Sequence, residues 1–344
     1  MNNKVQPRDA VLQAMRFEET KPCPYYAWID PAMVDALAGI YGSERFLGSA
    51  GGLITFDGSF TAMTEVKAQP VHDDGEYFED EYGAKLRRGS ILHLETPALG
   101  GPSLDGYTFP DMTTDIHFAH LDAWAQTHAS RFRIVQVGKL FWERTWFMRG
   151  MQEIMMDFHT NPDFVEALFD GLVEICLGVI DKLLSDYGSR FDAIGFSEDY
   201  GTEISLMISP ATWRRFIKPH LARLCERVRR GGKRFYLHSC GHVRPLIPDF
   251  VEIGVDMLQP LQPEAMDIFE IKRTFGHELC LVGGISTQQT LPFGTPEEVR
   301  SEVGKCLEHM ATGGGYIMAP AKPILPGVPL ENARALIDAF TEQA

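Results

Sequence analysis

Short apolar runs alternate with segments of helical periodicity from about residue 132 to the end of the chain. Strands that are separated by helices of this length form right-handed βαβ units, in which neighbouring strands are parallel. The alternation therefore predicts an α/β fold built on a parallel sheet. The predicted strands are RIVQVG (133–138), DAIGFS (192–197), RFYLHS (234–239), DMLQPL (256–261), LCLVGG (279–284) and YIMAP (316–320).

The segments between these runs carry helix start signals. Thr295 precedes a proline and has a glutamate, Glu298, three residues on, which is the pattern of a capping box. Asn161-Pro162 begins a second predicted helix, which runs to about Ser185. Ser209-Pro210 begins a third, whose apolar residues fall on one face: Trp213, Phe216, Ile217, Leu221, Leu224 and Val228.

The number of predicted strands favours a (β/α)8 barrel of the TIM type. Six strands follow residue 132, YYAW (25–28) is a further candidate, and one more is expected before residue 132. An open doubly wound sheet is the alternative, although no G-x-G-x-x-G follows a first strand.

Residues 73–110 break the alternation. A polar loop there is followed by a predicted antiparallel hairpin, EYGAKLRRG and then SILHLE. We expect this insertion either to cap the barrel mouth or to be a simple excursion on the protein surface. We predict one domain over residues 1–344 that contains this insertion.

Charge and hydropathy narrow the classes of partner. The chain has 32 basic and 47 acidic residues and a net charge of −15, which disfavours nucleic acid and anionic membrane surfaces. The apolar stretch 168–184 is interrupted by three acidic residues, and the N-terminus shows no apolar signal segment. The six cysteines have no framework spacing, so we expect a cytoplasmic protein with mostly buried thiols.

His238 and Cys240 are the pair most suggestive of chemistry. They stand two positions apart at the end of RFYLHS, so in a strand they would project from the same face. Imidazole and thiolate are good zinc ligands, and the carboxyl ends of the strands form the catalytic face of such barrels. A core histidine packed beside a buried thiol is the alternative.

A catalytic zinc needs a third protein ligand, here from another strand end. Glu198 and Asp199 follow DAIGFS directly, on the strand before His238. We expect Glu198 to be the third ligand and Asp199 to orient His238 or act as an acid–base group. Capping of the next segment is the alternative for both carboxylates. Cys280 begins its strand, which places it at the opposite end of the barrel, so we reject it as a ligand.

Other polar or small residues also fall at predicted strand ends. Gln259 and Gln262 flank the end of DMLQPL, where they can bind a polar substrate, and Gly283-Gly284 ends a late strand whose loop often binds phosphate. A strand-terminating turn is the alternative for each of them.

Long stretches of the sequence resemble the uroporphyrinogen decarboxylase-like superfamily. They are FYLHSCGHVRPLIPDFVEIGVDMLQPLQPEAMD, LVGGISTQQTLPFGTPEEVRSEV, GGGYIMAP and PLENARALIDAF, with QPRDAVLQAMRFEETKPCP and DEYGAKLRR nearer the start. The resemblance implies a distorted (β/α)8 barrel. It also implies one of two branches: decarboxylases of porphyrin synthesis, or cobalamin-dependent methyltransferases in which an H-x-C pair and a later cysteine hold zinc.

Two features favour the methyltransferase branch. No arginine lies between Arg16 and Arg45, where the true decarboxylases carry an arginine-bearing segment that grips substrate carboxylates. His238 and Cys240 match the H-x-C pair of the methyltransferases residue for residue.

One departure from that branch concerns the later cysteine. Lys322 stands in the loop after YIMAP, and no cysteine follows Cys306. Lys322 is a poor zinc ligand because its amine would have to lose a proton, but it can bind an anionic substrate group.

The resemblance thus implies a methyltransferase that moves a methyl group between a corrinoid or methylated small molecule and a thiol or folate-type acceptor. The implied cofactors are zinc and cobalamin. The implied partners are a small-molecule substrate and a corrinoid protein, and a homodimer is a further possible assembly. A lyase acting on a carboxylic acid and a non-catalytic corrinoid- or porphyrin-binding module are the alternatives.

Overall fold

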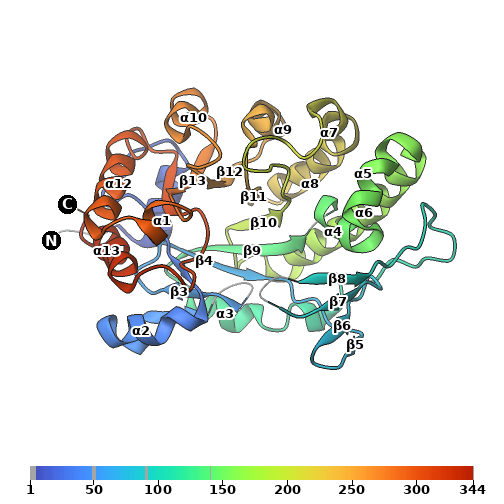
Figure 1. Cartoon of the computed structure of the whole chain (residues 1–344), viewed down its shortest axis with the longest axis horizontal. Coiled ribbons are helices and arrows are strands. Elements are labelled where there is room, and N and C mark those ends of the chain that lie inside the picture. Colours follow the sequence, from blue (N-terminus) through green and yellow to red (C-terminus); the bar gives the residue numbers. More distant parts are fainter. Residues whose placement is uncertain (1–4, 49–51, 90–91, 140, 344) are drawn as a thin grey trace.

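The computed structural model describes residues 5–48, 52–89, 92–139 and 141–343. Its centre is a curled sheet of seven strands, all parallel to their neighbours, as Figure 1 shows. The predicted parallel α/β fold is confirmed, and each of the six strands predicted after residue 132 is present. In sheet order the strands are β14 (Tyr316–Pro320), β13 (Cys280–Ile285), β12 (Met257–Leu261), β11 (Arg234–His238), β10 (Ala193–Ser197), β9 (Phe132–Lys139) and β4 (Thr61–Glu65).

The segment that contains YYAW lies between the two edge strands of this sheet. Tyr25 forms a parallel bridge with Met318 of β14, and the backbone N–H of Tyr26 donates to the Met318 carbonyl at 3.1 Å. On the other side, the N–H of Phe60, just before β4, donates to the Tyr25 carbonyl at 2.8 Å. The segment therefore takes the eighth position, and the fold is of the TIM type.

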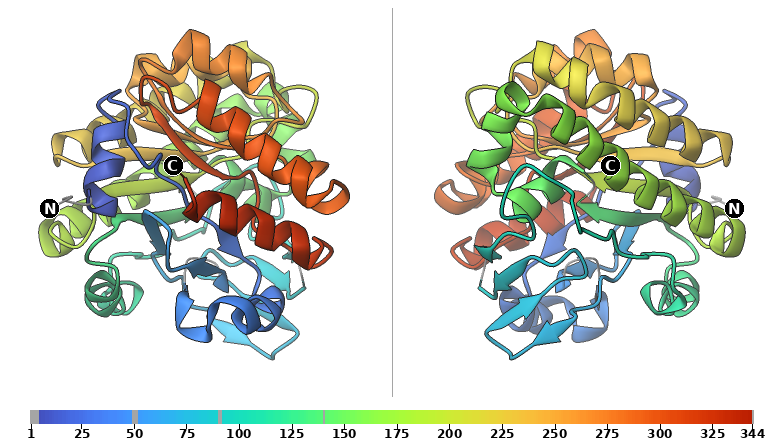
Figure 2. Two further views of the ribbon diagram at one scale, coloured as in Figure 1. Left: turned by 90° about the vertical axis from the view of Figure 1, so that its left-hand side faces the viewer. Right: turned by 90° about the vertical axis from the view of Figure 1, so that its right-hand side faces the viewer.

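Beyond this position the chain leaves the barrel. Residues Trp28–Ile29 (β1) pair antiparallel with β3 (Ile54–Phe56), which also pairs with β2 (Phe46–Gly48). The helix α2 (Pro31–Tyr41) belongs to this part. By contrast, α1 (Pro7–Ala14) packs on the barrel strands β4, β9 and β14, and α3 (Leu121–Thr127) lies between β4 and β9 in the chain. In Figures 1 and 2, α2 and the small sheet lie on the side of the barrel away from α10.

Helices form the outer layer of the barrel. They are α4 (Trp142–Arg149), α5 (Met151–Thr160), α6 (Pro162–Tyr187), α7 (Pro210–Phe216), α8 (Lys218–Arg230), α9 (Ile247–Ile253), α10 (Ile268–Phe275), α11 (Thr290–Phe293), α12 (Pro296–His309) and α13 (Leu330–Thr341). Among the described residues, no helix combines the length and the apolar character that a membrane span requires.

The predicted helix starts are confirmed, with one difference. Thr295 and Glu298 form the capping box, and the Ser209 hydroxyl accepts the N–H of Thr212 at 3.0 Å. The apolar face predicted from Trp213 to Val228 belongs to two helices, α7 and α8, that meet at Ile217. Pro219 stands in the first turn of α8, where the missing N–H of proline is tolerated, and it cannot continue α7.

The insertion forms a four-stranded antiparallel sheet in which the predicted hairpin is one half. The strands are β5 (His72–Asp73), β6 (Tyr77–Glu79), β7 (Lys85–Arg87) and β8 (His93–Thr96), in that order; residues 90–91 lie outside the described part. Asp80 pairs with Arg144 of α4 at 2.6 Å, and Leu99 N–H donates to the Met148 carbonyl at 2.7 Å. Because α4 follows the carboxyl end of β9, the insertion packs beside that end of the barrel.

Candidate functional site

The carboxyl ends of β10 and β11 lie side by side. Ser197 is the register partner of His238, and the Glu198 N–H donates to the His238 carbonyl at 2.9 Å. The residues that follow the two strands are therefore neighbours. Among the described residues, one group of three potential metal ligands stands out, namely Asp199, His238 and Cys240, whose ligand atoms all lie within 4.8 Å of one another.

The three side chains form a compact N, S and O donor set. The Nε2 atom of His238 lies 3.1 Å from Cys240 Sγ and 3.6 Å from Asp199 Oδ1. The same carboxylate oxygen accepts the backbone N–H of Cys240 at 2.7 Å. Three protein ligands of these kinds leave one position open on a tetrahedral zinc, which is the composition of a catalytic site.

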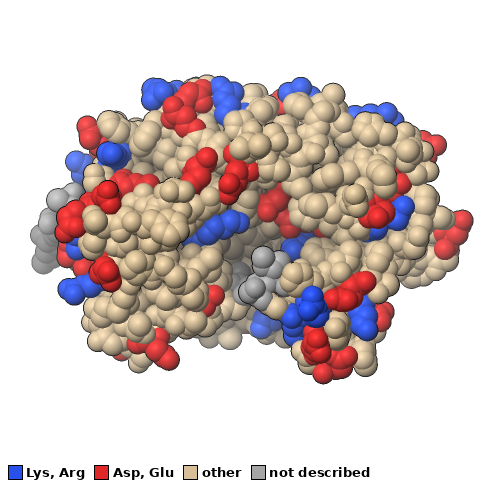
Figure 3. Space-filling model, in the orientation of Figure 1, with Lys and Arg blue, Asp and Glu red and all other residues tan. Residues whose placement is uncertain are grey.

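The surface above the sheet is concave. In Figure 3 the molecule is hollowed near its middle, over the region where Figure 1 labels β4, β9 and β10, and both basic and acidic side chains border the hollow.

Glu198 faces away from this group. Its two carboxylate oxygens accept the backbone N–H groups of Phe141, at 2.7 Å, and Glu143, at 3.1 Å, at the start of α4. The side chain is fully buried there. The expectation for Glu198 therefore differs from the structure: its carboxylate holds the N-terminus of α4, a position that favours a carboxylate, whereas Asp199 stands beside His238 and Cys240.

The two glutamines predicted to bind substrate, Gln259 and Gln262, contact the side chain of His238 and the backbone of Gly241. The Oε1 atom of Gln259 contacts His238 Nδ1, and Gln262 Oε1 accepts the N–H of Gly241 at 3.2 Å. Both side chains are buried. Their contacts are with the protein, so the structure gives them a supporting place around the Asp199–His238–Cys240 group.

Glu143 lies at the site although no sequence pattern predicts it there. Its Oε1 accepts the Asp199 N–H at 2.9 Å, and its Oε2 lies 3.8 Å from Lys139 Nζ. Burial raises the pKa of Glu143, and the charge of Asp199 raises it further. No spacing signal marked this residue, because it lies inside α4 and reaches the site only through the turn after β9.

The charged groups of the site shift the pKa values of Asp199 and His238 toward the charged forms of both side chains. Burial alone raises the pKa of Asp199, but His238, the Cys240 amide and Lys322 hold it below its ordinary value. Burial lowers the pKa of His238, and the interactions with Cys240 and Asp199 outweigh this and raise it to about 9. A metal ion that binds His238 Nε2 must therefore displace a proton at neutral pH.

Lys322 also contacts the thiol of Cys240. It follows β14, and its Nζ donates to Cys240 Sγ at 2.7 Å. Burial lowers the pKa of Lys322, but Cys240 and Asp199 raise it above its usual value. An ammonium group thus stands where the superfamily resemblance places a cysteine. Cys280, which was rejected as a ligand, lies at the start of β13, and burial raises the pKa of its thiol to about 12.

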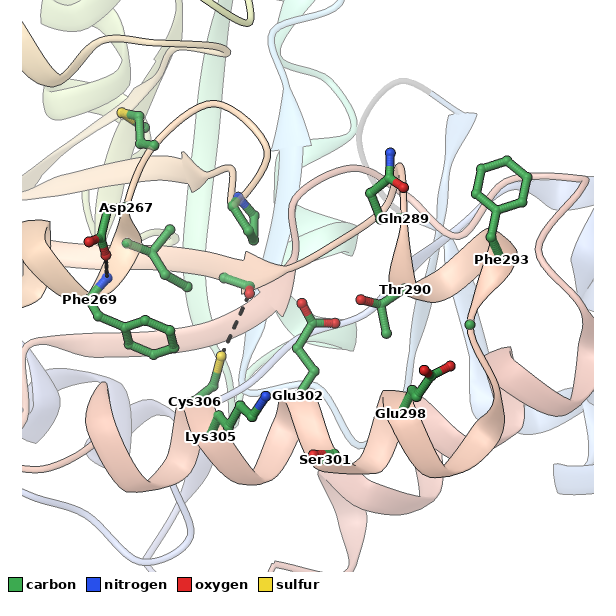
Figure 4. A pocket seen from close by; sticks show the side chains of 15 residues that line it. Asp267, Phe269, Gln289, Thr290, Phe293, Glu298, Ser301, Glu302, Lys305 and Cys306 are labelled. Atoms are coloured by element: carbon green, nitrogen blue, oxygen red, sulfur yellow. Dashed lines mark hydrogen bonds between the residues drawn. The ribbon is translucent and has the colours of Figure 1, made fainter.

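Gly283 and Gly284 serve strand packing. A Cβ atom at Gly283 would lie 2.6 Å from the backbone nitrogen of Leu261, and φ there is +131°, so only glycine fits. Gly284 lines an outer pocket of about 620 Å³ between α10 and α12, with Glu302 and Cys306 (Figure 4). The structure therefore does not place these glycines beside the Asp199–His238–Cys240 group.

Comparison with protein families gives a match over most of the barrel. Residues 145–343, which include all three members of the ligand group, match the model of the family described as uroporphyrinogen decarboxylase (URO-D). The chain belongs to the URO-D family.

The curated relatives of this URO-D-family chain include methyltransferases. It is 26% identical, over 193 residues, to the methylated-thiol–coenzyme M methyltransferase of Methanosarcina mazei, covering 56% of this chain and 48% of the relative. It is 32% identical, over 136 residues, to a methylcobamide:CoM methyltransferase of Methanosarcina barkeri, covering 40% of this chain and 38% of the relative. The chain thus spans less than half the length of these curated relatives.

A solved structure shows the same fold over nearly the whole chain. A methyltransferase from Methanosarcina mazei superposes with a TM-score of 0.71 at 18% identity, covering 98% of this chain and 99% of that one. At this level of identity the match establishes the architecture, and the chemistry must be argued from the site.

Proposed function

We propose that this URO-D-family chain is a methyltransferase that moves a methyl group from a corrinoid or a methylated small molecule to a thiol or folate-type acceptor. The observation that carries the proposal is the group of Asp199, His238 and Cys240, with ligand atoms within 4.8 Å of one another at the carboxyl ends of two barrel strands. The methyltransferase relatives support the reaction class.

The donor set fits zinc. Asp199, His238 and Cys240 would hold the ion, and their contacts already bring one oxygen, one nitrogen and one sulfur atom together. When bound, zinc keeps the sulfur of a thiol acceptor deprotonated near neutral pH. The fixed backbone contact from Cys240 to Asp199 keeps both side chains in place for this role.

The transfer itself is a displacement at carbon. A bond forms between the acceptor sulfur and the methyl carbon while the bond from that carbon to the donor breaks, and the donor keeps the electron pair of that bond. The thiol proton passes to solvent before the attack. The chain's task is to orient the acceptor and to exclude water from the barrel mouth. The insertion beside α4 borders that mouth. The partner we propose is a corrinoid protein that presents the methyl group there. We further propose that the enzyme is cytoplasmic and consists of a single domain.

The test uses the wild-type chain. We expect one zinc per chain by elemental analysis under reducing conditions, and loss of the methyl–cobalt absorbance when methylcobalamin is incubated with thiols. Release of carbon dioxide from a carboxylic acid, without methyl transfer, would establish the lyase alternative. Corrinoid binding without turnover of any donor and acceptor would establish the binding module.

Lys322→Met is expected to tighten zinc binding by about tenfold or more. The Lys322 ammonium lies 2.7 Å from Cys240 Sγ, so it would repel a dication bound there. Unit charges about 4 Å apart interact by about 4 kcal/mol near a protein surface, and about 1.4 kcal/mol corresponds to tenfold in affinity. Chelator competition measures the change. Unchanged or weaker zinc binding in Lys322→Met would contradict a metal at Cys240.

A further inference from the structure

We infer that Gln259 is a positioning residue, which orients the imidazole of His238 so that Nε2 faces Asp199 and Cys240. The inference rests on the proposed metal site and adds to it a residue that would touch neither metal nor substrate. It concerns the floor of the site, where side chains from β11, β12 and the segment before β1 meet inside the barrel.

The sheet register places Gln259 next to His238. The two residues are partners in the parallel pairing of β11 and β12, so their side chains leave the sheet on the same face. Gln259 Oε1 contacts His238 Nδ1, and the Ser239 N–H donates to the Gln259 carbonyl at 2.7 Å. Gln259 is 1% exposed, so water does not compete for this contact.

A buried tyrosine lies on the other side of the Gln259 amide. Tyr26 comes from the segment that fills the eighth barrel position, outside the matched family region, and it is 2% exposed. Burial raises the pKa of Tyr26, and Tyr236 and Gln259 lower it in part, as groups that donate toward its oxygen do. No described group completes a well-formed hydrogen bond to this hydroxyl, so a donor on the Gln259 amide would be favoured on the side of Tyr26.

The orientation of the amide decides which nitrogen of His238 is available. An amide oxygen only accepts, so Gln259 Oε1 requires the proton on Nδ1, and Nε2 is then the nitrogen that gives up its proton to a metal ion. The opposite orientation would place the NH2 group at Nδ1 and the proton on Nε2, which would remove that nitrogen from a metal site. Partners of this kind typically contribute roughly 10- to 100-fold to metal affinity.

The experiment compares zinc affinity in three variants of the full chain, by chelator competition. Gln259→Leu removes the acceptor and is expected to weaken zinc binding by roughly 10- to 100-fold. Gln259→Glu keeps an acceptor oxygen and is expected to restore affinity to at least the wild-type value. Gln136→Leu is the matched control: it removes another buried barrel glutamine, whose Nε2 lies 3.2 Å from Met63 Sδ.

The outcomes separate a positioning role from a structural one. Weak zinc binding in Gln259→Leu alone, with rescue in Gln259→Glu, supports the inference. Equal losses in Gln259→Leu and Gln136→Leu, or a wild-type affinity in Gln259→Leu, would overturn it. If zinc binding follows the expected order but no methyl transfer occurs, the proposed reaction fails and the role of Gln259 stands. If the wild-type chain binds no zinc, both fail.

Discussion

Cys240→Ala is expected to lose stoichiometric zinc and methyl transfer together while the barrel stays folded. The thiol is the one sulfur among the three donors of the site, and Asp199 and His238 would remain as a pair. The loss should exceed the roughly 10- to 100-fold that removal of an outer partner costs. Elemental analysis and the decay of the methyl–cobalt absorbance measure the two effects, and circular dichroism verifies the fold.

Cys280→Ala provides the control for this substitution. Cys280 is a buried thiol at the start of β13, at the other end of the barrel strands. We expect this variant to keep its zinc and its activity, with a stability cost on the order of 1 kcal/mol from the small cavity. Methyl transfer at the wild-type rate in Cys240→Ala would refute the proposed role of the thiol, whatever its zinc content.

The sequence predicted the fold because the signals for it are local. Apolar runs separated by capped helices determine a parallel sheet, and each barrel strand predicted after residue 132 is present. The pair of His238 and Cys240 was predicted for the same reason, since spacing of two at a strand end is a local pattern. The break between α7 and α8 was missed, although Pro219 was visible, because the apolar periodicity continues across it.

The different positions of the two acids also have a local cause. Side chains alternate between the faces of a strand. Ser197 is the register partner of His238, so Glu198 leaves on the opposite face and Asp199, two residues on from Ser197, returns to the face of His238. Periodicity could have selected Asp199, but only once the register between β10 and β11 was known.

Other parts of the site depend on contacts between distant segments. Glu143 reaches Asp199 from a helix more than fifty residues earlier in the chain. Tyr26 lies near Gln259, on the segment that fills the eighth barrel position. No motif marks either residue. Such supporting groups follow from barrel closure and from helix packing, which a single sequence does not specify.

The different contacts of the two acids predict opposite effects when each is removed. Glu198→Ala leaves the N–H groups of Phe141 and Glu143 buried without their acceptor. Each such group costs about 1–3 kcal/mol, so the free energy of unfolding should fall by roughly 2–6 kcal/mol. The folded variant should still bind zinc with wild-type affinity. Urea unfolding followed by tryptophan fluorescence, and chelator competition on the folded protein, measure the two quantities.

Asp199→Ala should behave in the reverse way. Its carboxylate accepts the Cys240 N–H at the rim of the site and is half-buried, so the free energy of unfolding should change by about 1 kcal/mol. The zinc affinity, by contrast, should fall by more than about 100-fold. The comparison is decisive because the two acids are adjacent in the chain and differ mainly in the direction of their side chains. If Glu198→Ala released the zinc and Asp199→Ala kept it, the ligand group would have to be rebuilt around Glu198.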